Sequence, residues 1–445
     1  MKKAIVFGNG VSGKGAKKLL EHEEIEVILV DDKSGVTSKA ALEILDEIQL
    51  FIKSPGIPFD NFLVKAALEK NIEVIDEIEL GYRYIKEKNL STKIIAITGS
   101  NGKTTTTSKI TELLQKAGFK AMHAGNIGNS LAELILENKD LEYAVLELSS
   151  FQLEGIKDFK ADISLIVNLS PDHLDRYELV DDYYDAKFNI CKNQKDNDIF
   201  IYNLNDEETL KRLADKVKCK TLGVTVDKRK EQANCYDKDG WLIYNDEKVL
   251  ETSKLSLKGK HNLENTLFIV TVAKNLNISN ETIQKCLYNT KSLEHRMELF
   301  YKWGKTIFIN DSKGTNLDST TFAIEAYKNS ILICGGKDKG LPLEGIVETI
   351  KNNIKAVYLI GKMADRMEES LLKGGYPKEN IYNLKTLKNV LKNLKEKLTV
   401  NDEEIILLSP STSSFDQFKS FEHRGEVFKS LVEEIFVGGE RLWVK

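Results

Sequence analysis

Residues 93–105 read KIIAITGSNGKTT, an apolar strand followed by a glycine turn and the first residues of a helix. Glycines let backbone N–H groups curl around phosphate oxygens, and the amino end of the helix adds a favourable dipole. Lys103 is then expected to reach the β- and γ-phosphates, and Thr104 to ligate Mg²⁺. Only two residues separate Gly99 from Gly102, so the loop is shorter than the usual G-x-x-x-x-G-K-[ST] pattern. The stretch predicts a nucleotide-binding α/β domain.

A second glycine loop lies near the amino end of the chain. Residues 8–13 read GNGVSG directly after an apolar strand at residues 3–7, and Asp31 and Asp32 end the next strand. The acidic pair follows the loop by about 20 residues, which completes the dinucleotide-binding fingerprint. Taken alone, this pattern predicts an NAD-dependent dehydrogenase. A dehydrogenase has no use for the second phosphate loop, however, and no separate hydride-transfer constellation is visible.

Strands alternate with helical stretches along the whole chain, which predicts parallel sheets covered by helices. A polar stretch at residues 86–92 reads as a linker, residues 225–254 as a small antiparallel excursion, and residues 261–275 as a helix. Further apolar strands are expected at residues 25–30, 49–52, 143–148, 163–169, 199–203, 306–310, 330–334, 356–360 and 405–408. We therefore predict an α/β fold of three domains.

The three predicted domains follow the two glycine loops and the strand pattern. Residues 1–90 form a Rossmann-like domain, residues 91–294 a central P-loop-type ATP-binding domain, and residues 295–445 a Rossmann-like C-terminal domain.

Composition narrows the class of protein. The chain has 445 residues, of which 41% are apolar and 30% charged, as in an ordinary globular protein. Its net charge is −4, and its positive and negative residues are interspersed along the sequence, so no basic face for nucleic acid is expected. The five scattered cysteines contain no C-x-x-C pair, which argues against a disulfide framework and a zinc site. No apolar run approaches the ~18 residues of a membrane span. The opening MKKAIVFGNG holds no apolar signal segment. The expectation is a cytoplasmic monomer.

Ordered motifs along the chain resemble the Mur ligase family, which also includes folylpolyglutamate synthases. TGSNGKTT is similar to the family's ATP loop, and Gly314 stands where the family commonly has alanine. The other matching segments are GNIG at 125–128, ELSSFQLE at 147–154, NLSPDHLDRY at 168–177, DAK at 185–187, GKHN at 259–262, HR at 295–296, NDSKGTN at 310–316 and LSPSTSSFDQFKSF at 408–421.

The resemblance implies an ATP-dependent amide-forming ligase of peptidoglycan synthesis. ELSSFQLE and SFDQFKSF are typical of the branch that adds D-glutamate to UDP-N-acetylmuramoyl-L-alanine through an acyl phosphate. Rival readings within the family are ligases for L-alanine or a diamino acid, and the folate branch. An inactive relative that only binds nucleotide is a further alternative, but Lys103, Glu147, His173 and Lys187 are all present.

The family's functional positions carry over onto this chain residue by residue. Those implied for catalysis are Lys103, Glu147, His173 and Lys187, and those implied for two Mg²⁺ ions are Thr104, Glu147, His173 and Lys187. ATP is expected at Gly99, Ser100, Asn101, Gly102, Lys103, Thr104, Thr105, Asn262, Asn265, Arg296 and Asp311. The UDP-sugar is expected at Val11, Ser12, Gly13, Asp31, Asp32, Ser54, Pro55, Gly56 and Asn126, and D-glutamate at Lys313, Thr315, Lys339, Ser414 and Phe421.

Lys187 carries the sharpest of these expectations. A protonated lysine has no acceptor, so it would repel Mg²⁺ and could not ligate it. The resemblance implies that CO₂ carbamylates Lys187, which replaces a cation with an oxygen-bearing anion of the kind that Mg²⁺ prefers. Outside its motif, Lys187 would read as an exposed helical lysine, and His173 as an ordinary hydrogen-bonded histidine.

Overall fold

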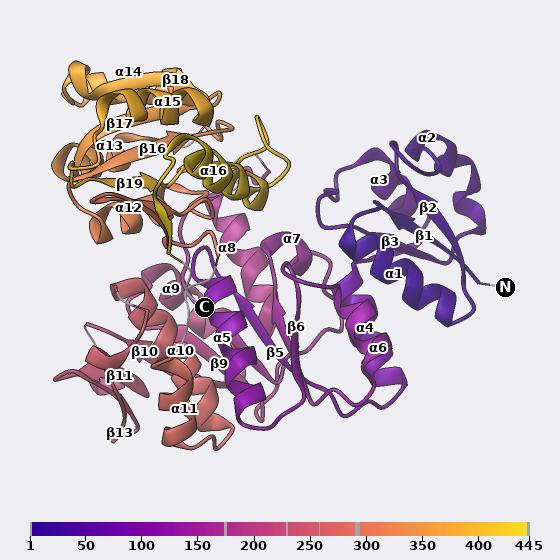
Figure 1. Ribbon diagram of the computed structural model, residues 1–445. Coiled ribbons are helices and arrows are strands. Elements are labelled where there is room, and N and C mark those ends of the chain that lie inside the picture. Colours follow the sequence, from indigo (N-terminus) through magenta and orange to yellow (C-terminus); the bar gives the residue numbers. More distant parts are fainter. Residues whose placement is uncertain are drawn as a thin grey trace. The chain divides into compact units, whose positions relative to one another are not determined.

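The chain folds into three β-sheets with helices packed on them (Figure 1), so the predicted α/β class is confirmed. The computed structural model describes residues 2–172, 176–227, 230–257, 259–289, 294–340 and 342–442. Residues 1–169 and 179–289 form one compact unit, which holds the first two sheets. Residues 170–178 and 290–445 form the other unit, which holds the third sheet.

The first sheet is parallel, with strand order β2-β1-β3-β4. Helices α1 (Val11–His22) and α3 (Phe62–Glu69) follow its first and third strands, and apolar residues such as Ile5, Phe51 and Leu63 are fully buried in its core. The strands are β1 (Lys3–Phe7), β2 (Glu26–Val30), β3 (Leu50–Lys53) and β4 (Glu73–Ile75). The sequence did not predict β4, which has only three residues.

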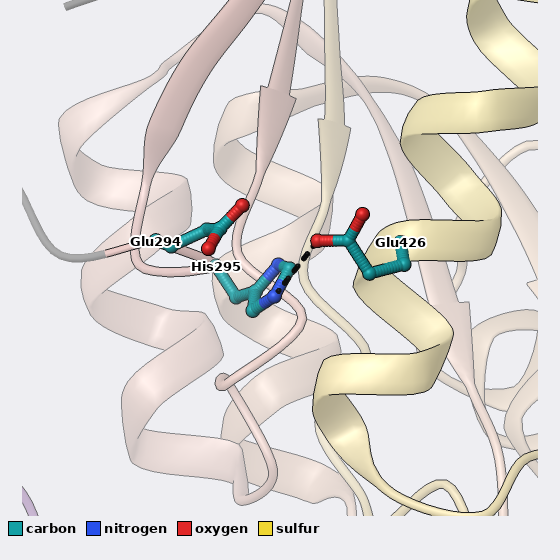
Figure 2. A group of neighbouring side chains, drawn as sticks. All are labelled: Glu294, His295 and Glu426. Atoms are coloured by element: carbon teal, nitrogen blue, oxygen red, sulfur yellow. Dashed lines mark ion pairs between the residues drawn. The ribbon is translucent and has the colours of Figure 1, made fainter. Parts of the chain in front are cut away.

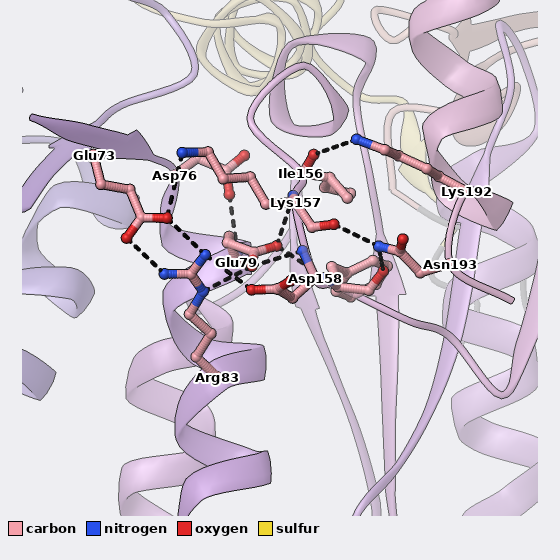
Figure 3. A network of polar contacts seen from close by, with 10 residues as sticks. Glu73, Asp76, Glu79, Arg83, Ile156, Lys157, Asp158, Lys192 and Asn193 are labelled. Carbon is pink, nitrogen blue, oxygen red and sulfur yellow. Dashed lines mark hydrogen bonds and ion pairs between the residues drawn. The ribbon is translucent and has the colours of Figure 1, made fainter. Parts of the chain in front are cut away.

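Helix α4 (Glu77–Glu87) connects the first sheet to the second and continues into the stretch that was expected to be a linker. Its first turn carries buried carboxylates (Figure 3). Asp76 accepts a bond from Glu79 N at 3.0 Å and thereby caps the helix. Glu79 in turn accepts the backbone N–H groups of residues 157–159 at 2.9–3.0 Å. Arg83 bonds to both Glu79 and Glu73, so this turn is fixed from several sides.

The second sheet has nine strands in the order β13-β12-β11-β10-β9-β8-β5-β7-β6. Its parallel part runs from β11 to β6, and the pairs of β12 with β11 and with β13 form the antiparallel excursion that the sequence predicted at residues 225–254. The strands are β5 (Lys93–Thr98), β6 (Ala121–Gly125), β7 (Tyr143–Glu147), β8 (Ile163–Ile166), β9 (Ile199–Asn203), β10 (Lys220–Thr225), β11 (Cys235–Lys238), β12 (Trp241–Tyr244) and β13 (Glu247–Glu251).

One apolar core packs helices onto this sheet. Ile95 and Ile97 of β5 meet residues of α5 (Lys103–Lys116), α10 (Lys260–Asn275) and α11 (Asn280–Leu287). The sequence predicted α10 at residues 261–275, within one residue of its observed start. Strand β5 is apolar on both faces and lies inside the sheet, which places the turn after it at the carboxyl edge of the sheet.

The third sheet has the order β18-β17-β16-β19-β15-β14-β20, in which β14 pairs antiparallel with both β15 and β20 and the strands from β18 to β15 pair parallel. Apolar residues alternate along its strands between two cores. One core contains residues of α12 (Leu317–Ala326), α13 (Glu344–Asn353) and α14 (Ala364–Lys373), and the other contains residues of α15 (Leu387–Lys397) and α16 (Phe421–Ile435). The strands are β14 (Glu298–Trp303), β15 (Thr306–Asn310), β16 (Ser330–Gly335), β17 (Ile354–Ile360), β18 (Ile381–Lys385), β19 (Ile405–Leu408) and β20 (Glu440–Arg441).

The topology of the third sheet marks a ligand-binding position. The neighbouring strands β16 and β19 lead into α13 and α16, which pack on opposite faces. Such a switch point leaves a crevice outside the carboxyl ends of the two strands. Across the described residues, no helix combines the length and the apolar character needed to cross a membrane.

Candidate active site

The predicted phosphate loop follows β5 and ends where α5 begins, as the sequence indicated. Lys103 Nζ donates to the carbonyls of Gly99 at 2.7 Å and Ser100 at 2.9 Å. Asn168 braces the loop, since its Oδ1 accepts from Asn101 N at 2.8 Å and its Nδ2 donates to Asn101 O at 3.1 Å. The sequence analysis did not single out Asn168, although it opens the NLSPDHLDRY motif.

Gly102 must be glycine for two reasons. Its φ of +84° is left-handed, and a Cβ atom there would lie 2.3 Å from Asn265 Oδ1. Asn265 on α10 therefore lies directly against the loop, where the resemblance places a nucleotide-binding residue. Asn262 stands one turn earlier on the same helix, and its carbonyl accepts a bond from Thr266 at 2.7 Å. Thr105 is buried in the first turn of α5.

Two buried oxygen atoms beside the loop suit a divalent cation. Among the described residues, Thr104 Oγ1 and Glu147 Oε2 are buried without a hydrogen-bond partner. Glu147 ends β7, whose neighbour β5 leads into the loop, and its other oxygen accepts from Asn126 Nδ2 at 2.8 Å. A buried carboxylate oxygen is costly unless it is paired, and Mg²⁺ prefers oxygen ligands of this kind. The donor set therefore fits one of the two predicted ions.

Lys187 is buried and lies at the same loop. It stands near the end of α8 (Val180–Phe188), with 1% of the residue exposed, and its Nζ donates to Gly99 O at 3.0 Å. The same Nζ lies 4.4 Å from the ring centre of Tyr183, whose hydroxyl is 3.3 Å from Ser100 Oγ. The structure thus brings Lys187, Lys103 and Glu147 to one edge of the sheet. His173 lies outside the described residues.

Helix α8 is tied to α9 (Glu207–Lys216) by a partly buried arginine. Arg212 Nε donates to Asp185 Oδ1 at 2.9 Å, and another of its nitrogens bonds to Asp181. Both acidic residues lie on α8, one and two turns before its end. The orientation of this helix, and with it the position of Lys187, is therefore fixed by side chains that the sequence analysis did not select.

Most of the residues predicted for the UDP-sugar gather at the carboxyl edge of the first sheet, whereas Asn126 follows β6 of the second sheet. Val11, Ser12 and Gly13 form the first turn of α1, and the segment Ser54–Gly56 follows β3. The Asp31 carboxylate accepts bonds from the backbone N–H groups of Lys33 and Asn9, at 3.0 and 3.1 Å, and from the Ser34 hydroxyl at 3.0 Å. These bonds lower the pKa of its carboxyl. Asp32 accepts bonds from the amide and hydroxyl of Ser38 at 2.7 and 2.9 Å.

The residues predicted for D-glutamate gather at the carboxyl edge of the third sheet, where its switch point lies. Four of them belong to three loops: residues 311–316 follow β15, residues 336–340 follow β16, and residues 409–415 follow β19, while Phe421 begins α16. Backbone bonds join the loops, from Ser411 N to Gly314 O and from Lys337 N to Ser413 O, both at 2.9 Å. Lys313 Nζ lies 3.9 Å from the ring centre of Phe421, and Ser414 is buried.

Arg424 holds two of these loops from inside the protein. Its guanidinium is fully buried and donates to Ser312 Oγ at 3.0 Å, to Ser312 O at 2.8 Å and to Thr412 O at 3.1 Å. Burial lowers the pKa of Arg424 to about 9. The sequence analysis missed this residue, because a single arginine on a helix more often lies in solvent.

Asp311 is buried beside these loops. Burial raises the pKa of its carboxyl to about 7, although Ser409 Oγ donates to it at 2.7 Å and Met297 N at 3.2 Å. The positive charge of Arg296 acts on the same carboxyl in the opposite direction. Two of the residues predicted for ATP, Arg296 and Asp311, are therefore neighbours.

Glu294, His295 and Glu426 form a group that could in principle hold a metal (Figure 2). The hydrogen bonds of His295 argue against a metal site. Asn310 Oδ1 accepts from Ser312 N at 3.2 Å, so its Nδ2 faces His295 Nδ1 at 2.9 Å and must donate to it. The neutral ring then carries its proton on Nε2, which faces Glu426 at 3.4 Å.

A cation already compensates the carboxylates of this group. Lys429 Nζ pairs with Glu426 at 3.0 Å and also with Glu294 and Glu298. The pKa of His295 is lowered by burial first and by Lys429 second, which keeps the ring neutral. We interpret the group as an ion-pair network that fixes His295, whose carbonyl accepts from Lys313 N at 3.0 Å.

Comparison with known proteins identifies relatives of this chain. The model of the Mur ligase middle domain matches residues 97–273. The UDP-N-acetylmuramoylalanine–D-glutamate ligase of Fusobacterium nucleatum is 52% identical over 436 residues, which cover 98% of this chain and all of that protein. The chain belongs to the Mur ligase family. The ligase of the same name from Thermoanaerobacter sp. (strain X514) is 38% identical, with 98% of each chain covered.

Solved structures of the family share the fold. MurF from Acinetobacter baumannii aligns with a TM-score of 0.65 at 16% identity, covering 97% of this chain and 93% of its own. The UDP-N-acetylmuramate–alanine ligase MurC from Thermotoga maritima aligns with a TM-score of 0.62 at 16% identity, covering 98% and 99%. Membership of the Mur ligase family confirms the predicted resemblance and disfavours the dehydrogenase that the first glycine loop alone suggested.

Proposed function

We propose that this protein is an ATP-dependent ligase that joins D-glutamate to UDP-N-acetylmuramoyl-L-alanine, with ADP and phosphate as the other products. This reaction is a step of peptidoglycan precursor synthesis. Full-length identity of 52% with a ligase of that name supports the substrate pair. The observation that carries the chemistry is the pair of buried oxygens, on Thr104 and Glu147, beside a phosphate loop.

The first step joins a carboxylate to a phosphate. An oxygen of the L-alanyl carboxylate attacks the γ-phosphorus of ATP, and ADP leaves as the acyl phosphate forms. Both partners are anionic, so the protein acts mainly by positioning them and by neutralising charge. Lys103 and the amino end of α5 supply that charge at the phosphate loop. A Mg²⁺ ion held by Thr104 and Glu147 would neutralise the phosphate oxygens further.

In the second step, the amine of D-glutamate attacks the acyl carbon and phosphate leaves. We place a second Mg²⁺ at Lys187 and His173, with Lys187 as the carbamate. Carbamylation of the Lys187 ammonium forms a bond between Nζ and the carbon of CO₂ and releases two protons. The carbamate retains one N–H on Nζ, which can still donate to Gly99 O, now 3.0 Å from Nζ. Its two oxygens supply the acceptors that an ammonium lacks.

The family resemblance assigns each substrate to its own set of residues. We place the pyrophosphate of the UDP-sugar at the amino end of α1, with Asp31, Asp32, Ser54–Gly56 and Asn126 around the rest of that substrate. The nucleotide of ATP belongs with Asn262, Asn265, Arg296 and Asp311. D-Glutamate belongs with Lys313, Thr315, Lys339, Ser414 and Phe421. Two lysines suit a substrate with two carboxylates, because hydrogen bonds between charged groups are the stronger ones.

A phosphate-release assay tests this function. The enzyme, ATP, Mg²⁺ and UDP-N-acetylmuramoyl-L-alanine are mixed with D-glutamate, L-glutamate, L-alanine or a diamino acid. We expect rapid release with D-glutamate alone. Equal turnover with L-alanine or a diamino acid would move the chain to another branch of the family. Thermal shifts with UDP and with NAD test the first sheet separately, and only UDP should stabilise the protein.

A further inference from the structure

Lys339 makes an ion pair that its expected role leaves unexplained. It lies in the loop after β16, and its Nζ is 2.8 Å from Asp172 Oδ1 and 3.3 Å from Thr315 O. Only 10% of the Lys339 side chain and 8% of the Asp172 side chain are exposed. The two residues are 167 positions apart in sequence, yet residues 170–178 belong to the same compact unit as the third sheet.

The ion pair between Asp172 and Lys339 is expected to contribute little to the stability of the folded protein. Two charges taken out of water lose hydration that their mutual attraction only partly restores, so a buried ion pair often contributes little to folding. Neither residue belongs to a helix or strand, and both stand in loops at an edge where a ligand is expected. A buried pair of opposite charges on loops is better explained by a ligand that carries the same two charges.

An α-amino acid is such a ligand, because its ammonium and its carboxylate stand on one carbon atom. Lys339 can receive the carboxylate, and a carboxylate beside it can receive the ammonium. We propose that Asp172 is a substrate-binding residue that receives the α-ammonium of D-glutamate. This inference rests on the proposed function, and in particular on Lys339 as a residue of the amino-acid site.

The arrangement amounts to an exchange of partners. Before the substrate binds, Asp172 and Lys339 neutralise each other at 2.8 Å. The substrate replaces this one pair by two, since its carboxylate bonds to Lys339 and its ammonium to Asp172. No buried charge is left without a partner in either state, which keeps the exchange inexpensive. Asp172 thereby orients the nitrogen, which attacks the acyl carbon after the ammonium has released one proton to solvent.

The consequence for specificity is direct. A ligand that keeps both carboxylates of D-glutamate but carries a hydroxyl in place of the ammonium loses the positive charge beside Asp172, although its hydroxyl can still donate to that carboxylate. D-2-Hydroxyglutarate is that ligand. We expect it to bind the wild-type enzyme about ten- to a hundredfold more weakly than D-glutamate, the ratio expected for one hydrogen bond between charged groups.

The test compares these two ligands in wild type and in Asp172→Asn. Dissociation constants are measured by calorimetry with UDP-N-acetylmuramoyl-L-alanine and a non-hydrolysable ATP analogue present. In the variant, D-glutamate should weaken about ten- to a hundredfold, while D-2-hydroxyglutarate changes by less than about threefold. Asp172→Glu keeps the charge and should keep a preference for the amine. If Asp172→Asn does not fold, the same two dissociation constants are compared between the wild type and Asp172→Glu.

The matched control is Glu404→Gln, which breaks the exposed pair between Glu404 and Lys355 in the same unit. Neither ligand should change its affinity there. Equal weakening of both ligands in Asp172→Asn would mean a purely structural role and would overturn the inference, as would no weakening of either. Failure of the proposed function looks different, since the wild-type enzyme would then not release phosphate with D-glutamate.

Discussion

Glu77 makes the protein sensitive to alkaline pH at the turn that joins its first two sheets. Its side chain is buried at the start of α4, and Oε1 accepts from Ala132 N of α6 (Leu131–Glu137) at 2.6 Å. Among the described residues Oε2 has no hydrogen-bond partner. Burial raises the pKa of this carboxyl from 4.5 to about 8, and the neighbouring charge of Asp76 acts in the same direction. Glu77→Gln replaces the neutral acid by its closest uncharged analogue.

The magnitude follows from the two pKa values. Between pH 4.5 and about 8, the folded protein holds a proton on Glu77 that the unfolded chain has lost. The stabilisation is complete below the unfolded value and is lost as pH rises toward 8, at about 1.4 kcal/mol per pH unit. From about pH 5.5 to about pH 8, the wild-type protein should lose roughly 3 kcal/mol that the glutamine variant keeps.

Amide hydrogen exchange measures this pH-dependent loss of stability at α4 itself. Peptides from α4 report the free energy of opening of that helix, after correction for the intrinsic exchange rate at each pH. Wild type and Glu77→Gln should open with similar free energies near pH 5.5 and should diverge as pH rises. Glu137→Gln, an exposed change on α6, should follow the wild type. A variant whose opening energy falls with pH as steeply as that of wild type would falsify the reasoning.

Four further substitutions at three positions test the site. Lys187→Ala and Lys187→Arg should both lose nearly all turnover while retaining ATP binding. Acetate should restore part of the activity of the alanine variant. In labelled bicarbonate, the wild-type enzyme alone should show a carbamate signal by carbon-13 NMR. Near-normal turnover by Lys187→Arg would refute the carbamate. Gly102→Ala should weaken ATP more than about tenfold by calorimetry, because its Cβ would meet Asn265 Oδ1 at 2.3 Å, and wild-type affinity would contradict this. Arg424→Lys should raise the KM for D-glutamate about tenfold while leaving that for ATP unchanged, since it loses bonds to Ser312, and a parallel rise in both would point to general unfolding.

The strands that the sequence predicted well are those whose residues are apolar on both faces. The expectations for β5, β7 and β15 agree with the structure within one residue, because a buried parallel strand needs a continuous apolar run. Strand β4 has the sequence EVI and was missed, since three residues give no measurable periodicity. The stretch expected as a linker at residues 86–92 starts inside α4, whose polar last turn resembles a loop in composition.

The site shows a different division between what sequence can and cannot predict. Lys103 and Thr104 follow from local spacing, because the loop that uses them is continuous in sequence. Asn168 and Arg424 act on loops that are close only after folding: Asn168 bonds to Asn101, and Arg424 to Ser312, across 67 and 112 positions. Single asparagine and arginine residues occur throughout any surface, so nothing in their local sequence separates them from solvated residues.

Lys187 shows how the folded geometry adds a reason that the motif alone does not contain. Both Lys103 and Lys187 donate to the carbonyl oxygen of Gly99, at 2.7 and 3.0 Å, so their nitrogens are at most 5.7 Å apart. Two positive charges at that separation repel each other by about 3 kcal/mol at an effective dielectric constant of about 20. A carbamate on Lys187 would replace this repulsion with attraction toward Lys103 and toward a cation at the buried oxygens of Thr104 and Glu147. The proposed carbamate would therefore relieve an electrostatic conflict within the loop as well as supply oxygen ligands for a metal ion.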